Sequence, residues 1–289
     1  GTKVSVGKLY IGFPETVVLE KIYVEDKQKD TLLYGGSIKI DVGLMDLILG
    51  NGVNVNTVAL ENITAKVKRE LPDTAFNFQF IIDAFASKDA KPDNPADTSA
   101  TPFSIGSVSL NKIRVLYKDA VTGNDIEANL DHFDTKFDAF DPDKMKFAIG
   151  ETKLNGLVLR AWQTKPLVVE KPEITAHAAQ KEETVPEVKI REIDLQKIYV
   201  DYKNDVSALY ALLNLGQLKI KPDKIDLSAQ DIDLGNILLS QTTAAVRLGK
   251  TDTANIAVKQ PEASSPSSNW KIRLASLQLD HNNIRFDDD

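Results

Sequence analysis

The chain has 289 residues, of which 42% are hydrophobic and 27% are charged, a composition that supports a folded protein and excludes broad disorder. Its formal net charge is −7 and it contains no block of basic residues, which argues against nucleic acid as a partner. It has no cysteine, which excludes disulfides, thiolate zinc sites and cysteine nucleophiles.

Apolar and polar residues alternate over much of the first 86 positions, which predicts strands with one apolar face. In the segment SIKIDVG (37–43), Ile38, Ile40 and Val42 fall on one face and two charged residues fall on the other. The segment FNFQFII (76–82) has the same period and predicts a further strand. The stretches GLMDLILG (43–50) and IIDAFA (81–86) are candidates for single helical turns.

A pattern that begins at residue 103 recurs farther along the chain. Its apolar residues advance in steps of two and three, and adding 85 to each number gives another apolar residue. The steps of three indicate that the apolar face changes about every five residues, at a bulge or a tight turn. The matched residues are Phe103, Ile105, Val108, Leu110, Ile113, Val115 and Tyr117, and then Val188, Ile190, Ile193, Leu195, Ile198, Val200 and Tyr202.

Further matches extend the repeat over most of the chain. A second stretch of each unit recurs at a spacing of 80, which pairs Phe147 with Leu227 and Leu154 with Leu234. A weaker match, at a spacing of 91, relates the start of the chain to the same pattern. The predicted units are a divergent first unit over 1–86, two units over 103–163 and 188–249, and the truncated start of a fourth over 270–289.

Segments rich in proline, serine, alanine and charge separate the units, over 87–102, 164–187 and 259–269. They cannot bury enough apolar surface to order themselves, so we expect flexible loops at one edge of a single structure. Helical signal is otherwise thin. The segment DVSALYALLN (205–214), with Asp205 as an N-cap, predicts two to three helical turns.

These patterns predict a mainly β chain with few short helices. Each unit of about 60 residues is marginal for folding alone, so we expect one elongated, repeat-built and curved sheet, with roughly four strands from each unit. A single sheet must cover its apolar face, and folding it over gives a groove with an apolar interior. The candidates for the groove lining are Val108, Leu110, Phe147, Leu154, Ile193, Leu195, Leu227 and Leu234.

The sequence contains no catalytic motif. Its glycines form neither a dinucleotide fingerprint nor a phosphate-binding loop, and its histidines, His132, His177 and His281, are far apart. Its acidic clusters lack the ligand spacing of a calcium site and the aromatic platforms of a glycosidase. Trp162 and Trp270 favour packing at the edges of units over a carbohydrate or lipid contact. We therefore expect a protein that is not an enzyme and uses no cofactor or metal.

The stretch from VSVGKLYIGF to NITAKVKR (4–69), followed by FNFQFIIDAF (76–85), resembles the segment after the inner-membrane helix in TamB-type proteins of Bacteroidetes, within the AsmA-like group. The resemblance is strongest in DTLLYGG (30–36) and FNFQFIIDAF, and the repeats extend it more weakly toward the end of the chain. The chain opens and closes within strand-like patterns, so we expect it to be a fragment of a longer protein.

The resemblance implies a periplasmic protein, anchored in the inner membrane in its full-length form, with a long taco-shaped β-groove. The implied partners are phospholipid or another acyl lipid, a BamA-like outer-membrane protein bound through a region outside this chain, and the inner membrane through an N-terminal helix also outside it. The resemblance transfers no active-site residue.

Three functions fit these observations. The first is a conduit for phospholipid between the inner and outer membranes. The second is a periplasmic scaffold or chaperone that pairs its sheet edges with substrate strands and assists the insertion or secretion of outer-membrane β-barrel proteins. The third is a surface β-repeat interaction protein with a sealed core in each unit. An enzyme is the least favoured interpretation.

Overall fold

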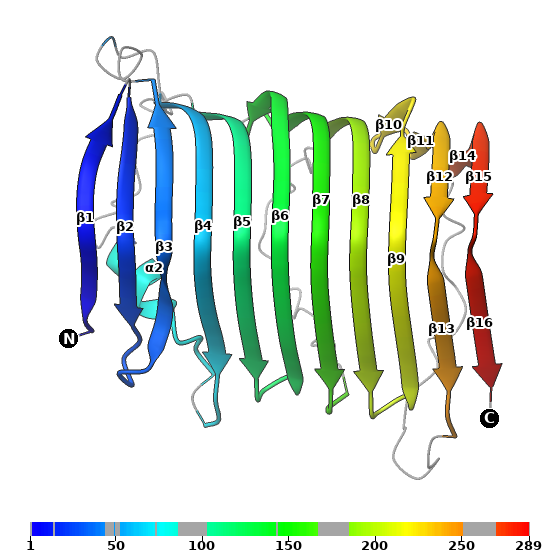
Figure 1. Ribbon diagram of the computed structural model, residues 1–289, viewed down its shortest axis with the longest axis horizontal. Helices are drawn as coiled ribbons and strands as arrows, with labels where there is room; N and C mark the ends of the chain where they lie inside the picture. Colours follow the sequence, from blue (N-terminus) through cyan, green and yellow to red (C-terminus); the bar gives the residue numbers. More distant parts are fainter. Residues whose placement is uncertain are drawn as a thin grey trace, which may run out of the picture.

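The chain folds mainly into β-structure, as the sequence predicts (Figure 1). The computed structural model describes residues 2–13, 15–43, 49, 53–72, 74–85, 103–142, 144–166, 185–250 and 270–288. Thirteen strands form one large open sheet, in the order β1-β2-β3-β4-β5-β6-β7-β8-β9-β12-β15, with β13 beside β9 and β16 beside β13. Three short strands form a second sheet in the order β10-β11-β14.

The strands of the large sheet reach 18 residues in length. They are β1 (Val4–Gly12), β2 (Thr16–Glu25), β3 (Thr31–Val42), β4 (Val53–Arg69), β5 (Phe103–Asp119), β6 (Asn124–Asp141), β7 (Lys146–Gln163), β8 (Glu187–Asn204), β9 (Leu209–Lys221), β12 (Asn236–Ser240), β13 (Thr243–Leu248), β15 (Ser276–Asp280) and β16 (Asn283–Asp288). The small sheet contains β10 (Lys224–Asp226), β11 (Asp231–Asp233) and β14 (Lys271–Arg273), and the helix α2 spans Gln79–Phe85.

Strand direction defines the repeating unit of the large sheet. Neighbours are antiparallel except at β4–β5, at β7–β8 and where β12 and β13 meet β15 and β16, which are parallel. The spacing of 85 between Leu110 and Leu195 spans β5, β6 and β7, so a unit has three strands, not the expected four. Each bent strand holds two apolar runs, which the sequence presents as separate strands.

Parallel neighbours require a crossover connection, and the predicted loops fall in these connections. The loops 87–102 and 259–269, and most of 164–187, lie outside the described residues. The described parts of the units share one continuous sheet, which confirms the elongated and curved architecture expected from the sequence.

The long strands bend at positions that line up across the sheet, which we call the crease. In strands of one direction the crease residue has a positive φ, between 49° and 78°, a conformation that is costly for residues other than glycine. Opposite these residues, the antiparallel strands place Gly7, Gly36, Asp131 and Gly216. The positive-φ crease residues are Lys21, Asn62, Lys112, Gly156, Lys197, Gln241 and His281.

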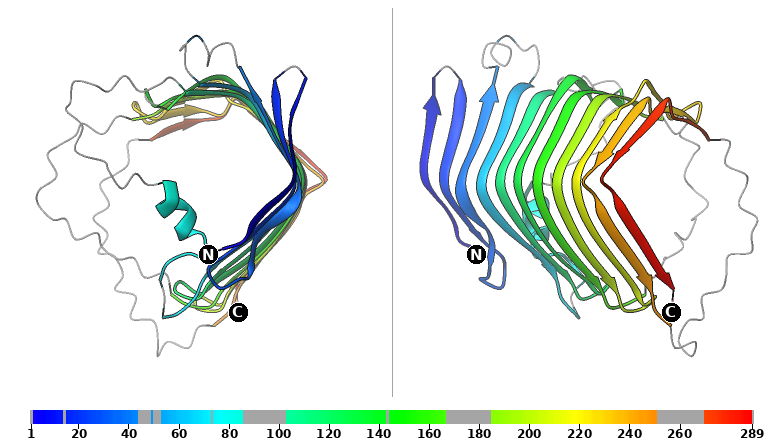
Figure 2. Two further views of the ribbon diagram at one scale, coloured as in Figure 1. Left: turned by 90° about the vertical axis from the view of Figure 1, so that its left-hand side faces the viewer. Right: turned by 45° about the vertical axis from the view of Figure 1, so that its right-hand side comes forward.

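A residue with positive φ interrupts the two-residue alternation of a strand. In β5, Leu110 and Ile113 are three residues apart with Lys112 between them, and in β8 the crease residue Lys197 has the same position. The interruption keeps the apolar residues before and after it on one side of the sheet, so the expectation that the apolar face changes there is wrong. The result is a sheet bent in register along its length, with α2 on its concave side (Figure 2).

Residues 205–214 form a tight turn and the start of β9, so the predicted helix is wrong. The side-chain oxygen of Asn204 accepts the backbone N–H groups of Val206 and Ser207, at 3.0 and 3.1 Å, and Ala208 has a φ of 50°. The following strand pairs with β8 on one edge and with β12 and β13 on the other. Pairing on both edges outweighs the local helical pattern.

The segment FNFQFII forms a turn and the start of α2, so the strand predicted there is also wrong. The backbone N–H of Asn77 donates to the carbonyl of Lys68 at 2.9 Å, and the helix begins two residues later. The helical turn predicted in IIDAFA is confirmed over residues 81–85. The turn predicted in GLMDLILG lies almost entirely outside the described residues.

Candidate functional site

Apolar side chains form rows that cross the large sheet at right angles to its strands. Paired residues on neighbouring strands point to the same face, so each row follows from the strand register. The Leu110 row, named after its member on β5, has an apolar residue on each of the eleven strands in the path from β1 through β9 to β12 and β15. Its members are Leu9, Leu19, Ile38, Leu60, Leu110, Phe133, Leu154, Leu195, Leu218, Leu239 and Leu279.

Three parallel rows, named in the same way, complete what we call the four apolar rows. The Val108 row comprises Ile11, Val17, Ile40, Val58, Val108, Thr135, Thr152, Ile193, Ile220, Ile237 and Leu277. The Val115 row comprises Val4, Val24, Leu33, Ala65, Val115, Ala128, Leu159, Val200, Leu213, Ala244 and Ile284. The Tyr117 row comprises Val67, Tyr117, Ile126, Ala161, Tyr202, Ala211, Val246 and Phe286.

The four apolar rows lie on the concave face. The ring of Phe76, just before α2, is 6.1 Å from the ring of Tyr117, and α2 lies on the concave side (Figure 2). The crease keeps the Val108 and Leu110 rows on the same side as the other two. The residues that alternate with these rows face the convex side, and most of them are polar; among them, Arg114 pairs with Glu127 at 2.8 Å.

Apolar side chains are covered best beside the crease, and the rows are covered least at the two edges of the sheet. Next to the rows and beside the crease, the paired residues Ile198 and Leu215 are 7% and 5% exposed, whereas the row members Leu9 on β1 and Leu279 on β15 are 68% and 60% exposed. Eleven strands at ~4.8 Å give the rows a length of about 50 Å. A continuous apolar surface of this length marks a ligand or partner site.

Five of the predicted lining residues lie in these rows. Leu110, Leu154 and Leu195 share the Leu110 row, and Val108 and Ile193 share the Val108 row. The strand register therefore brings together residues that are up to 87 positions apart in the chain.

The other three predicted lining residues lie outside the rows. Phe147 is near the start of β7, and Leu227 and Leu234 follow β10 and β11. The residue that shares a row with Leu154 is Leu239, at a spacing of 85, so the match at a spacing of 80 is wrong. Steps of two and three add up to five, and a repeat with this pattern still fits when it is displaced by five residues.

Strand β10 and the residues that flank it face the first residues of β7 and β8 across a cavity of about 670 Å³. Its charged lining includes Arg191, which is paired with Asp138 through contacts of 2.8 and 2.9 Å. The apolar lining includes the predicted residue Leu227, so this residue contributes to a side cavity and not to the rows. The apolar lining residues are Ala148, Ile149, Pro186, Val188, Ile190, Pro222, Ile225 and Leu227.

Sequence reasoning missed the role of the polar positions in the motif that the chain repeats as LEKI, LNKI and LQKI. Its lysines are the crease residues Lys21, Lys112 and Lys197. At or just after the end of each of these strands, a side chain accepts backbone N–H groups of the following turn; those residues are Asp26, Asp119 and Asn204. The threefold occurrence of this motif was the sequence signal for these positions, and each occurrence marks a bend followed by a turn.

Asp119 anchors the lower margin of the concave face and is only 2% exposed. Arg69, the last residue of β4, donates from Nε to Oδ1 of Asp119 at 2.8 Å and from Nη2 to Oδ2. The Tyr117 hydroxyl donates to the same carboxylate at 3.1 Å. The hydrogen bonds from Arg69 hold the pKa of Asp119 far below its usual range, and burial raises the pKa of Tyr117. The pair ties the first unit to the second.

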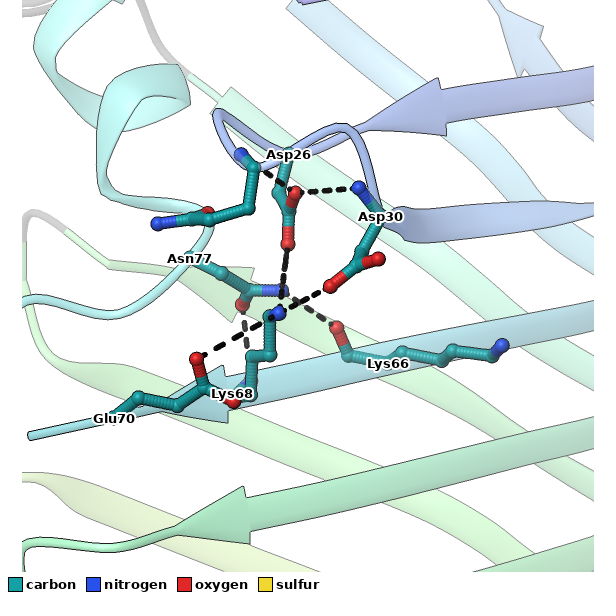
Figure 3. A network of polar contacts seen from close by, with 7 residues as sticks. Asp26, Asp30, Lys66, Lys68, Glu70 and Asn77 are labelled. Atoms are coloured by element: carbon teal, nitrogen blue, oxygen red, sulfur yellow. Dashed lines mark hydrogen bonds and ion pairs between the residues drawn. The ribbon is translucent and has the colours of Figure 1, made fainter.

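A second network fixes the segment before α2 (Figure 3). The side-chain oxygen of Asn77 accepts the N–H of Lys68 at 3.0 Å, and its amide donates to the carbonyl of Lys66 at 3.0 Å and to Asp26 at 3.3 Å. The ammonium group of Lys68 lies 3.7 Å from the buried Asp26 and 2.5 Å from Asp30, and the bond to Asp30 raises the pKa of Lys68. Asn77 thus forms hydrogen bonds to the part of β4 that lies beyond its pairing with β3.

The histidines and tryptophans flagged in the sequence do not converge on one site. His132 is on β6, His281 follows β15, and His177 lies outside the described residues. Trp162 donates to Asp205 at 2.8 Å, which fixes its ring at the end of β7. Within the described ranges, no group of three or more histidine, aspartate or glutamate side chains is arranged to hold a metal ion.

Among the helices in the described part of the chain, none has the length and hydropathy of a membrane span. No protein-family model matches the chain. A search of curated proteins finds no significant match. The geometry of the concave face is therefore the main support for a functional proposal.

Proposed function

We propose that this chain is part of a non-enzymatic envelope-biogenesis protein, whose apolar concave face conducts phospholipid between the inner and outer membranes. The proposal includes a periplasmic location and an inner-membrane anchor outside this chain, as the resemblance to TamB-type proteins implies. It also includes a BamA-like outer-membrane partner that binds outside this chain.

The observation that carries the proposal is the uninterrupted Leu110 row, which crosses the large sheet from Leu9 to Leu279. The row runs in the direction in which units are added, so each unit of three strands lengthens it by about 14 Å. A ligand on such a surface meets the same environment at each unit. This arrangement suits passage along the protein better than retention in one closed pocket.

The energetics of an acyl chain fit this role. Burial of a CH₂ group contributes ~0.8 kcal/mol, so a chain of about sixteen carbons gains roughly 13 kcal/mol in a bilayer or on an apolar protein surface. Because the two environments offer similar burial, transfer between them is close to neutral. A conduit needs this balance, since it must accept a chain at one end and release it at the other.

Two adjacent residues of β7 provide a matched test. Leu159 belongs to the Val115 row on the concave face, whereas Val158 lies between two rows and faces the convex side. Since an unpaired charge among acyl chains is costly, Leu159→Asp should slow the transfer of fluorescent phospholipid between vesicles by about tenfold or more, and Val158→Asp should change it less than about twofold. Circular dichroism of both variants checks that the fold is retained.

The proposal is refuted if the protein, purified without detergent, carries no phospholipid in native mass spectra and does not accelerate transfer. Equal transfer by the two variants, with lipid bound in both, would place the lipid away from the four apolar rows. Either result would remove the support for a conduit.

One observation favours the scaffold function as a second candidate. The edge strands of the large sheet, β1 and the β15–β16 pair, have apolar side chains and one edge without a partner among the described residues. Such edges can pair with a strand of another protein. Cross-linking of unfolded outer-membrane β-barrel proteins to β1 or β16, with no bound lipid, would select this function. The surface β-repeat alternative requires a sealed core in each unit, whereas the described units share one open sheet.

A further inference from the structure

The four apolar rows contain no charged side chain between β5 and β9, where every row residue is described. The polar members there are Thr135 and Thr152, whose hydroxyl groups bond to each other at 2.9 Å, and the margin residues Tyr117 and Tyr202. The Tyr117 hydroxyl is already bonded to Asp119 at 3.1 Å. The surface therefore offers contact area without a fixed charge.

Two arginines lie beside the rows, one near each end of the long strands, and both are engaged in ion pairs. At the lower margin, the guanidinium of Arg69 makes two hydrogen bonds to the buried carboxylate of Asp119. Toward the start of β8, Arg191 makes two contacts of 2.8 and 2.9 Å with Asp138. A lipid phosphate would have to break one of these pairs to gain an arginine.

We propose that the concave face binds lipids through their acyl chains alone and does not distinguish between headgroups. The inference rests on the proposed lipid function and names its ligand class: diacyl lipids of any headgroup, including diacylglycerol, which has no phosphate. Selection for a phosphate requires free arginine or lysine side chains or oriented backbone N–H groups at the site. Chain length should not be selected strongly either when lipid moves from a bilayer, because the bilayer and the concave face bury each CH₂ group to a similar extent.

Competition between headgroups tests this inference. The chain, free of detergent, is equilibrated with vesicles containing equal amounts of phosphatidylethanolamine, phosphatidylglycerol, phosphatidylcholine and diacylglycerol with identical acyl chains, and bound lipids are quantified by native mass spectrometry. We expect the four lipids to bind within about twofold of their supplied ratio, and a lipid with chains shorter by two CH₂ groups to bind in nearly the same proportion, because the vesicle and the concave face bury each CH₂ group similarly.

A cation added to the Val108 row should create the selectivity that the natural surface lacks. Thr152→Lys should raise the share of phosphatidylglycerol by about fivefold or more, since the new ammonium attracts the anionic headgroup. Leu277→Lys, at the exposed edge of the same row, does so without disturbing packed residues. Asn155→Lys, which lies between rows on the convex side, is the matched control and should leave the ratio unchanged.

The outcomes separate this inference from the proposed function. A preference of the unmodified protein for one phospholipid headgroup by more than about tenfold overturns headgroup indifference and leaves lipid binding intact. An unchanged lipid ratio in both Thr152→Lys and Leu277→Lys also overturns it, because the lipid would then bind away from this row. Failure to bind any of the four lipids refutes the proposed function and the inference together.

Discussion

The packing at the crease predicts that Gly216, on β9, tolerates no side chain. A Cβ atom added there would lie 2.6 Å from Cβ of Gln241, 2.7 Å from the backbone oxygen of Gln241 and 2.8 Å from that of Ser240. The two oxygens belong to backbone held between β12 and β13, which both pair with β9, so the strain can be relieved only by moving a strand. We expect Gly216→Ala to lower the free energy of unfolding by about 2 kcal/mol, as in other overpacked sites.

Gly12→Ala is the matched control on β1, because the nearest atom to an added Cβ is 3.6 Å away, an ordinary contact. Its free energy of unfolding should stay within about 0.5 kcal/mol of that of the unmodified protein. Urea unfolding followed by circular dichroism measures both variants. Equal urea midpoints for Gly216→Ala and Gly12→Ala would show that the strands do not approach at the crease as described.

Three further predictions concern the crease and the two polar networks. Because the folded state depresses the pKa of Asp119 below 3.8, its stabilising effect is complete above about pH 4 and is lost as the pH falls through the folded value. Arg69→Met should therefore lower the urea midpoint more at pH 7 than at pH 3, and an equal loss at both would contradict the pairing. Asn77→Ala removes the hydrogen bonds from Asn77 to β4, so hydrogen exchange in α2 should rise by about tenfold or more while β5–β9 stay protected; unchanged exchange would show that other contacts hold the helix. Lys197→Val should lower the free energy of unfolding by about 1 kcal/mol and Lys197→Gly should not, because a β-branched residue resists positive φ. Similar melting temperatures for these two variants would argue against the strained crease.

The β architecture could be predicted because the alternation of apolar residues and the repeat can both be read directly from the sequence. The spacing of 85 between Leu110 and Leu195 is one unit of three strands, and both residues lie in the same row. The number of strands in a unit was overestimated, because a bent strand presents two apolar runs. No local pattern reports the positive φ of Lys112 that joins those runs on one face.

The remaining errors come from contacts between distant segments and from the self-similarity of the repeated pattern. Residues 205–214 have a helical pattern, yet they form a turn and a strand because β8, β12 and β13 pair with β9. Leu234 was aligned with Leu154 because a pattern of two and three steps matches itself after five residues. Asn77 and Arg69 gave no sequence signal, since their partners on β2, β4 and β5 become neighbours only in the folded sheet.

The central claim is that the four apolar rows contact acyl chains, and site-specific photocross-linking tests it most directly. A benzophenone amino acid is placed at Leu154, in the Leu110 row, or at the adjacent Asn155, which faces the convex side. Each variant is irradiated with phospholipid vesicles, and lipid adducts are measured by mass spectrometry. We predict adducts at Leu154 and few or none at Asn155. Equal labelling of the two positions, or no labelling of Leu154 by a protein that still transfers lipid, would contradict a lipid path along the concave face.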